Sequence, residues 1–212
     1  MSLNKFSELF VDLDSSNSTN NKIEVLKKYF LSNRPIDNAW TIYLLTGKNN
    51  KRFVSGRYLR DLFSEVYDYP QWLIDTCYLK VGDSAEVISL LLKNKNASQA
   101  QKIHKISLNE LLSKILPELS KLNEEEKKLR IKKAWETLPA DNHLTFNKIL
   151  TGTFRVGVSV GLITKSISKL INIDEEIISH RLMGDFKPSI DSYNFLVNKN
   201  INLEELNSKP FP

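Results

Sequence analysis

The chain has 212 residues, of which 41% are hydrophobic and 26% are charged, and it contains only 7 glycines and 7 prolines. This composition excludes a disordered, collagen-like or low-complexity chain, because enough apolar surface is available to offset the conformational entropy lost on folding. A net charge of +5 by itself favours an anionic partner only weakly. The length suits one large domain or two small ones.

Cysteine content and hydropathy limit the cellular compartment in which the protein is expected. Cys77 has no second cysteine in the chain to pair with, so the fold requires no oxidising compartment. No apolar run approaches the roughly 18 residues that a transmembrane helix needs, and the first residues lack the basic and apolar regions of a signal peptide. We therefore expect a cytoplasmic protein with no membrane partner.

Apolar residues recur at intervals of three and four, as in Ile23, Leu26 and Phe30, and sustained strict alternation is scarce. This spacing predicts amphipathic helices rather than strands. In chain order, the residues expected at helix starts are Ser18 or Thr19, Ser55, Ser107, Asn123, Ser159, Asp174 and Ser189. Left-handed helix ends are expected at Gly47, Gly82, Gly152 and Gly184. About twelve helices result, which predicts an all-α fold.

Two stretches differ from the helical pattern. Residues 93–105 are rich in lysine and asparagine, which is typical of a surface connection between helices. Beyond Ser189 the helical signal weakens. We expect residues 191–212 to begin a linker to a further domain that is absent from this sequence.

The basic residues are unevenly distributed. Residues 41–60, 87–109 and 142–173 contain lysine or arginine and no acid. A single window of this kind is most simply a solvated helix face. Three windows that all exclude acid favour an anionic surface partner.

A short pattern occurs twice in the chain. The Leu-Leu-Thr-Gly string at 44–47 has a counterpart in Ile-Leu-Thr-Gly at 149–152, and Gly-Asp at 82–83 recurs at 184–185. Each Thr-Gly turn follows an amphipathic helix and precedes a basic loop and further helices. This order predicts an old duplication, with half-domains of about residues 20–105 and 106–190 related by an approximate two-fold axis within one domain.

The two Thr-Gly turns collect groups suited to phosphate oxygens. Glycines allow close approach of a ligand, and loop amides beside a helix N-terminus bind anions. The candidate phosphate-binding residues are Thr46, Gly47, Lys48, Lys51, Arg52, Ser55 and Arg57 in one half and Thr151, Gly152, Thr153, Arg155, Gly157 and Ser159 in the other. Two such loops related by a two-fold axis suit a nucleic-acid duplex.

A structural reading of the same residues stays open. Helix capping alone accounts for Gly47, Gly152 and Ser159, but it does not explain why cations accompany both turns. The apolar residues of the two loops could contact sugars in a minor groove, although core packing is the more frequent role of such side chains. These residues are Phe53, Val54, Phe154 and Val156.

Signatures of a self-contained enzyme site are absent from the sequence. His104, His143 and His180 do not have metal-ligand spacing, so we expect no metal site. Cys77 lies in an apolar helical stretch, where an inert buried thiol is expected. The acidic run 124–126 opens a helix and suits its dipole. The three tryptophans occupy apolar helical positions and are predicted to lie in the core; they are Trp40, Trp72 and Trp135.

Four strings of the sequence resemble the N-terminal DNA-binding domain of ATP-dependent DNA ligases, particularly the bacterial type. The strings are residues 39–47, 81–87, 146–159 and 180–185, and the likeness covers nearly the whole chain. Its most specific part is the Thr-Gly-x-x-Arg-x-Gly turn that enters a helix at Thr151, Gly152, Arg155 and Gly157. Thr153 is a departure, because relatives often have a second glycine at that point.

The resemblance implies an all-helical domain with internal pseudo-two-fold symmetry. Such a domain binds nicked double-stranded DNA through the minor groove and backbone on both sides of the nick, without sequence specificity, in replication, repair or recombination. The contacting positions would be around Thr46, Gly47, Lys48 and Arg52 in one half and Thr151, Gly152, Thr153, Arg155 and Gly157 in the other. The implied location is the bacterial cytoplasm, with association to the nucleoid when DNA is bound.

The family's nucleotide chemistry lies elsewhere in the parent enzyme. No Lys-x-Asp-Gly occurs in this sequence, so the lysine that takes AMP in the family is missing. The resemblance therefore implies a fragment that cannot seal nicks alone and that works with the adenylation and oligonucleotide-binding-fold (OB-fold) domains of the same parent chain. ATP and Mg²⁺ are implied only for the full-length ligase.

Two further hypotheses remain open from the residues. The chain could be a helical protein-interaction scaffold whose basic windows meet an acidic partner, which an exposed apolar patch with buried Leu-Thr-Gly turns would favour. It could also be an enzyme with an unrecognised site, which would require a deep pocket that holds a histidine or carboxylates with shifted pKa values.

Overall fold

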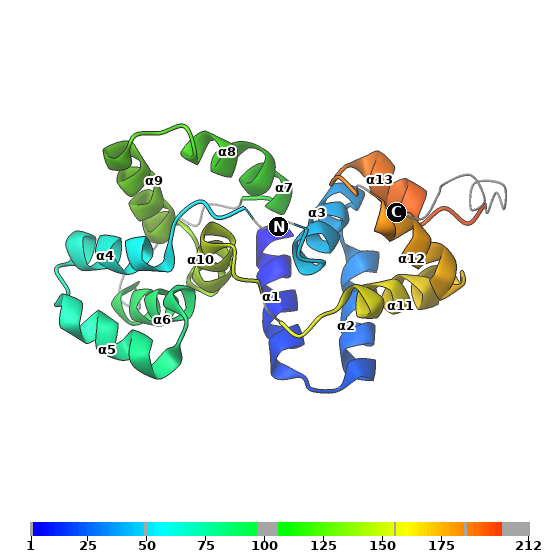
Figure 1. The fold of residues 1–212 in the computed structure, drawn as a ribbon, viewed down its shortest axis with the longest axis horizontal. Coiled ribbons are helices and arrows are strands. Elements are labelled where there is room, and N and C mark those ends of the chain that lie inside the picture. The colour runs from blue at the N-terminus through cyan, green and yellow to red at the C-terminus, as the bar shows by residue number, and fades with distance from the viewer. Residues whose placement is uncertain (1, 49–50, 97–105, 155, 185, 201–212) are drawn as a thin grey trace. The chain divides into compact units, whose positions relative to one another are not determined.

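The computed structural model describes residues 2–48, 51–96, 106–154, 156–184 and 186–200 (Figure 1). Over these residues the chain forms helices and no strand, which confirms the predicted all-α fold. None of the helices in the described ranges is long and apolar enough to cross a membrane.

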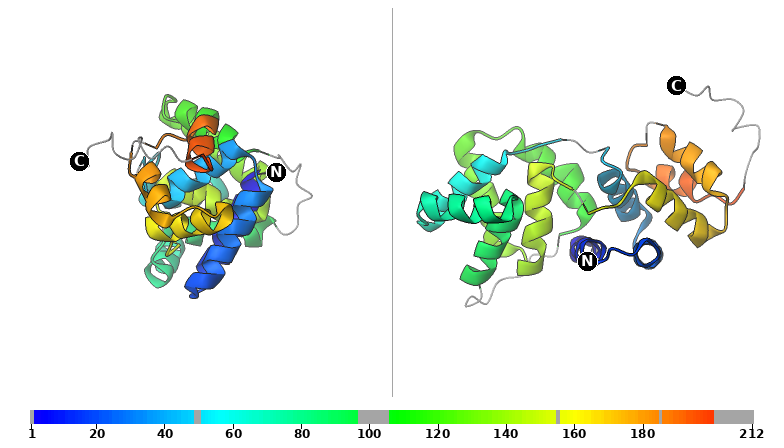
Figure 2. Two further views of the ribbon diagram at one scale, coloured as in Figure 1. Left: turned by 90° about the vertical axis from the view of Figure 1, so that its right-hand side faces the viewer. Right: turned by 60° about the horizontal axis from the view of Figure 1, so that its bottom comes forward.

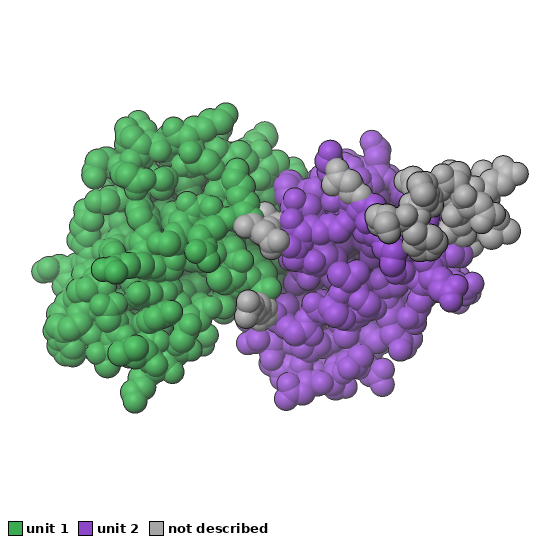
Figure 3. All heavy atoms as spheres, in the orientation of Figure 1, with its two compact units in different colours: residues 1–7, 50–154 green, residues 8–49, 155–212 purple. Residues whose placement is uncertain are grey.

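The chain divides into two compact units, and each unit combines two separate stretches of sequence (Figure 3). Unit 1 contains residues 1–7 and 50–154, and unit 2 contains residues 8–49 and 155–212. Helix α1, Ser2–Ser15, begins in the first unit and ends in the second. The units therefore do not coincide with the predicted consecutive half-domains, 20–105 and 106–190.

Unit 1 is built around helix α6, which packs against α4, α5 and α10. Figure 2 shows these helices gathered in one group, coloured cyan to yellow-green. The largest fully buried side chain is Trp135, which lies beside Phe63 with ring centroids 6.1 Å apart. The helices of this unit are α4 (Gly56–Tyr67), α5 (Gln71–Val81), α6 (Ser84–Asn96), α7 (Leu108–Glu110), α8 (Leu116–Leu119), α9 (Glu124–Thr137) and α10 (His143–Thr151), with a π-helical turn at Leu111–Ile115 and a 3-10 turn at Ala140–Asn142.

Unit 2 has two helix pairs that join distant parts of the chain. Helix α11 packs on α2 and α12, and α13 packs on α3 and α12. Its core contains Ile23, Leu26, Ile42, Ile163 and Ile167. The helices are α2 (Thr19–Ser32), α3 (Pro35–Leu45), α11 (Val160–Ile171), α12 (Glu175–Met183) and α13 (Ile190–Leu196).

The predicted linker from residue 191 is wrong at its beginning. Residues 190–196 form α13, and Tyr193 and Leu196 are buried in unit 2. The sequence signal was weak because this helix is only 7 residues long and leaves Phe195 exposed. Residues 201–212 lie outside the described residues, as does most of the predicted surface connection 93–105.

The helix ends follow most of the predicted signals. Asn123 and Glu126 form a complete capping box at α9, and the side chains of Ser18, Ser55, Ser107, Ser159 and Ser189 each accept a bond from the first turn of a helix. Gly47, Gly82 and Gly152 are left-handed. Gly184 is extended instead, with φ of -68° and ψ of -179°, so the predicted left-handed end of α12 is wrong.

Local motifs repeat at spacings of 104 or 105 residues. Asp68 and Asn172, 104 residues apart, both end a 12-residue helix in the left-handed conformation. Ser64 and Ser168 each donate a side-chain hydrogen bond to a carbonyl five residues later. The 14-residue helices α2 and α9 begin 105 residues apart. These repeats support the duplication, and the two-fold relation of its halves stays a prediction.

Candidate nucleic-acid interface

The turn that ends α10 is packed against residues 51–54 within unit 1. The amides of Phe53 and Val54 both donate to the carbonyl of Leu150, over 2.9 and 3.2 Å. Gly152 has a φ of +67°, and a Cβ added there would lie 3.3 Å from the Lys51 carbonyl oxygen. Glycine is thus needed both for the left-handed turn and for the close approach of the other segment. The structure therefore places residues 51–54, which belong to the first predicted loop, against the Gly152 turn, where the second predicted loop begins.

Cations and a helix N-terminus lie next to this contact. Arg52 and Arg57 are exposed, with 84% of the Arg57 side chain accessible, and the Lys51 ammonium lies 5.2 Å from the centre of the Phe53 ring. Ser55 caps α4 by accepting from the Tyr58 amide over 3.0 Å. The amides that open a helix have no acceptor inside it. We call Lys51, Arg52, Ser55 and Arg57 the unit 1 basic surface.

Gly56, at the start of α4, has a packing role. A Cβ at this position would lie 2.8 Å from the Ser84 hydroxyl on α6. The absence of a side chain therefore allows α4 and α6 to pack closely, and close approach of a ligand is not needed to explain this glycine.

The Thr46-Gly47-Lys48 turn belongs to unit 2 and is more open. Gly47 has a φ of +70°, and a Cβ added there would have no neighbour within 4 Å. The Lys48 ammonium donates to the carbonyls of Leu182, at 2.9 Å, and Gly184, at 2.6 Å. These carbonyls close the end of α12, where a cation is favourable. Lys48 therefore stabilises the helix end, and a phosphate would compete for an ammonium that is already hydrogen-bonded.

The remaining candidates of unit 2 surround the start of α11. Ser159 accepts from the Leu162 amide over 3.2 Å, and Gly157 is exposed with a φ of +60°. The carbonyls of Val156 and Gly157 both accept from the ammonium of Lys22. Arg155 lies outside the described residues.

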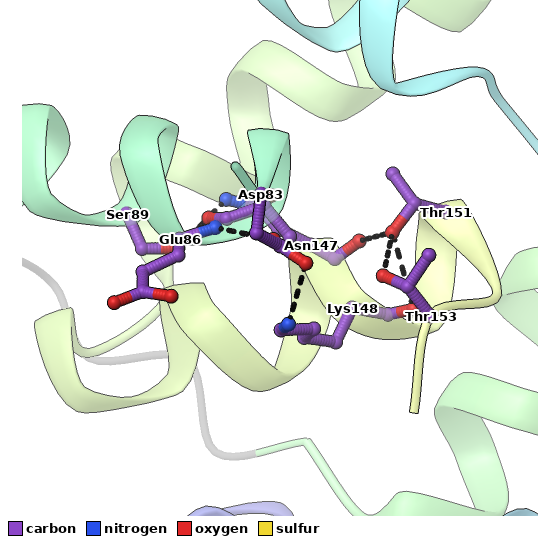
Figure 4. A network of polar contacts seen from close by, with 8 residues as sticks. Asp83, Glu86, Ser89, Asn147, Lys148, Thr151 and Thr153 are labelled. Carbon is purple, nitrogen blue, oxygen red and sulfur yellow. Dashed lines mark hydrogen bonds and ion pairs between the residues drawn. The ribbon is translucent and has the colours of Figure 1, made fainter. Parts of the chain in front are cut away.

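The threonine hydroxyls of the two turns are engaged inside the protein, as Figure 4 shows for Thr151 and Thr153. Thr46 donates to the Ile42 carbonyl at 2.8 Å, and Thr151 donates to the Asn147 carbonyl at 2.9 Å. Because the Thr151 proton is used in this way, the 2.8 Å contact between Thr151 and Thr153 makes Thr153 the donor. The three hydroxyls therefore satisfy internal acceptors, which the sequence alone did not indicate.

A polar network that sequence reasoning missed supports the α10 turn (Figure 4). Asn147, fully buried, accepts from the Trp135 indole at 2.9 Å and donates to Ser89 at 3.0 Å. Lys148 pairs with Asp83 at 2.7 Å, and Asp83 also caps α6. The available signal was an asparagine at an apolar helical position, where a buried polar group needs partners.

The structure also decides the role of most apolar loop residues. Val54 and Val156 are buried, and Phe154 packs on Phe6 with ring centroids 5.8 Å apart. Core packing, which the sequence favours as the more frequent role, therefore accounts for these three residues. Among the tryptophans, Trp135 is buried as predicted, whereas Trp72 is 69% exposed on α5, so its predicted core position is wrong.

Titratable groups do not assemble a metal centre in the described residues, where no group of three histidine, cysteine, aspartate or glutamate side chains could hold an ion. His143 is buried in unit 1, and burial lowers the pKa of its imidazole. Cys77 is half-buried rather than fully buried.

A comparison with protein families matches residues 2–168, most of the chain, to the family described as DNA ligase N terminus. The chain belongs to this family of DNA ligase N-terminal domains. A search of curated proteins found no match. The all-helical fold agrees with such an N-terminal domain, and a DNA ligase domain implies DNA as substrate and other ligase domains as partners.

Proposed function

We propose that this chain is the DNA-binding module of an ATP-dependent DNA ligase of the bacterial type, and that it grips nicked duplex DNA through the phosphate backbone. The observation that carries the proposal is the contact between residues 51–54 and the Gly152 turn, since it gathers cations and backbone amides on one surface. The family membership supports it independently.

In unit 1 the binding groups are cationic side chains and amides rather than threonine hydroxyls. Arg52 and Arg57 can each present a guanidinium fork to phosphate oxygens. Ser55 uses its oxygen as a cap and keeps its own proton for an acceptor outside the helix. Contacts of this kind fix the position of the protein on DNA and carry no sequence information.

Unit 2 contributes the second set of contacts. The open backbone at Gly47 allows close approach of a sugar or phosphate, and the amides around Gly157 and Ser159 supply donors. Arg155 follows from the sequence motif and is included in the proposal on that ground. Contacts of both units with the minor groove on the two sides of a nick would make the module independent of base sequence.

The parent enzyme would supply the nick-sealing chemistry in replication, repair or recombination. The sequence contains no Lys-x-Asp-Gly, and the described residues offer no three-member metal cluster. The residues present therefore do not fit ATP or Mg²⁺, and we derive no step through either. The adenylation and OB-fold domains of the parent chain are the proposed partners, and this chain alone should not seal nicks. The proposed location is the bacterial cytoplasm.

A second candidate function is favoured by one surface feature. Helix α5 buries only Ile74 among its residues and exposes Trp72 and Leu79. Exposed apolar groups of this kind can bind another protein, as the scaffold hypothesis requires. The exposed Gly47 argues against it, because that hypothesis expects buried Leu-Thr-Gly turns.

Fluorescence anisotropy with a nicked duplex, an intact duplex and a single strand tests the proposal directly. Arg52→Glu should weaken duplex binding at least about tenfold, since it replaces attraction to phosphate with repulsion. Arg155→Glu should act in the same way at every DNA sequence. Lys133→Glu, an equal charge change at an exposed position of α9, is the control and should have a small effect. Unchanged affinity for Arg52→Glu and Arg155→Glu would overturn the proposed surface.

A further inference from the structure

Lys22 is an unusual residue of unit 2 because its side chain is buried. It lies on α2 and is 9% exposed. Its ammonium donates to the carbonyl oxygens of Val156, at 2.9 Å, and Gly157, at 3.3 Å. A Cβ added to Gly157 would lie 3.0 Å from the same nitrogen. The ammonium and this short stretch of backbone are therefore closely fitted.

Burying an ammonium group is costly unless its protons find acceptors. The two carbonyls supply those acceptors, so turning either of them away would leave the charge unsatisfied. The described peptide bonds include no cis bond, and across a trans peptide the carbonyl and the following amide point in opposite directions. Lys22 therefore directs the amides of Gly157 and Val158 away from α2.

We propose that Lys22 is a positioning residue, which holds the Val156-Gly157 backbone so that the amides of Gly157 and Val158 face a DNA phosphate. This inference rests on the proposed function. In this proposal Lys22 does not contact the DNA, because its buried ammonium turns two of its three protons toward carbonyls inside unit 2. In unit 1, residues 51–54 precede α4 as Val156 and Gly157 precede α11. That segment is held instead by backbone hydrogen bonds from Phe53 and Val54 to the Leu150 carbonyl.

Lys22→Met tests this role, because methionine keeps most of the apolar stem and removes the ammonium. Two control variants on the same helix are available. Lys28→Met removes the same charge from an exposed position. Tyr29→Phe removes a buried hydrogen bond, the 3.0 Å contact with Thr41, and so controls for loss of stability in unit 2.

Binding of nicked duplex would be measured for all variants between 50 and 200 mM salt, together with the backbone NMR order parameters of the free proteins. We expect Lys22→Met to weaken binding about five- to tenfold, the cost of ordering a loop that is no longer held. The slope of log K against log salt should stay unchanged, whereas loss of a phosphate contact would reduce it by about 0.9. The order parameters of the Gly157 and Val158 amides should fall in this variant, and both controls should bind like the wild type.

Other results would overturn the inference. A slope reduced by about 0.9 would make Lys22 a phosphate contact, and wild-type affinity of Lys22→Met would show that the loop needs no positioning. If Tyr29→Phe weakened duplex binding as much as Lys22→Met, the loss of affinity would come from lower stability of unit 2 and not from the loop. If the wild-type chain bound no duplex, the proposed function itself would fail, and lower order parameters at Gly157 and Val158 in Lys22→Met would still show that Lys22 holds the loop.

Discussion

Replacing Gly152 with alanine should destabilise unit 1 more than replacing Gly82 with alanine. Both glycines end a helix of unit 1 in the left-handed conformation, with φ of +67° and +80°. A Cβ in this conformation costs about 1–2 kcal/mol at either position. Only at Gly152 would the Cβ also meet another segment, 3.3 Å from the Lys51 carbonyl oxygen and 3.7 Å from the Arg52 Cα. At Gly82 it would meet nothing within 4 Å.

The additional contact should separate the two variants in a denaturation experiment. Moving the 51–52 backbone by a few tenths of an ångström strains the bonds to Leu150, and overpacking of this kind costs about 1 kcal/mol or more. Urea unfolding, followed by tryptophan fluorescence, to which the buried Trp135 contributes, would give the free energies of unfolding of both variants. Gly152→Ala should also weaken DNA binding, because it displaces Arg52. Equal destabilisation of the two variants would refute the close packing of the loop on the turn.

Three other perturbations have defined outcomes. Lys48→Met should lower the stability of unit 2 by about 1 kcal/mol in urea unfolding, because the carbonyls at the end of α12 lose a charged donor. Asn147→Ala should cost about 2–3 kcal/mol and shift the fluorescence of Trp135, since two buried partners lose their bonds. Burial lowers the pKa of His143 from its ordinary 6.5, so the unfolded chain binds the extra proton and stability should fall as pH decreases below 6.5. Urea unfolding at pH 7.0 and 5.5 should show this loss in the wild type and in a His180→Gln control, but not in His143→Leu.

The fold class followed from the sequence because helix signals act locally. Apolar spacing, the capping box at Asn123 and the C-terminal glycines each depend on a few neighbouring residues. The extent of α13 beyond its predicted start at Ser189 and the extended Gly184 were missed for the opposite reason. Their conformations depend on packing against α3 and on the ammonium of Lys48, which are remote in the chain.

The residue types of the candidate site could be predicted from the sequence, but which of these residues lie together in the folded chain could not. The sequence placed residues 46–57 in one loop and 151–159 in another. Residues 51–54 instead pack on the Gly152 turn of unit 1, while Lys48 and Gly157 belong to unit 2. Which cations stay exposed also depends on tertiary contacts, as the pairing of Lys148 with Asp83 shows. Lys22 lies outside any motif, and the motif that contains Asn147 does not show which groups it bonds, so only the folded chain reveals the bonds of both residues.

The salt dependence of nicked-duplex binding by the wild-type chain tests the central claim most directly. About six phosphate contacts would give a slope near -5 in log K against log salt, and affinity would fall roughly a thousandfold between 50 and 200 mM salt. The account predicts such a slope for nicked and intact duplexes of any sequence. A slope near zero, or no binding of either duplex at 50 mM salt, would contradict it.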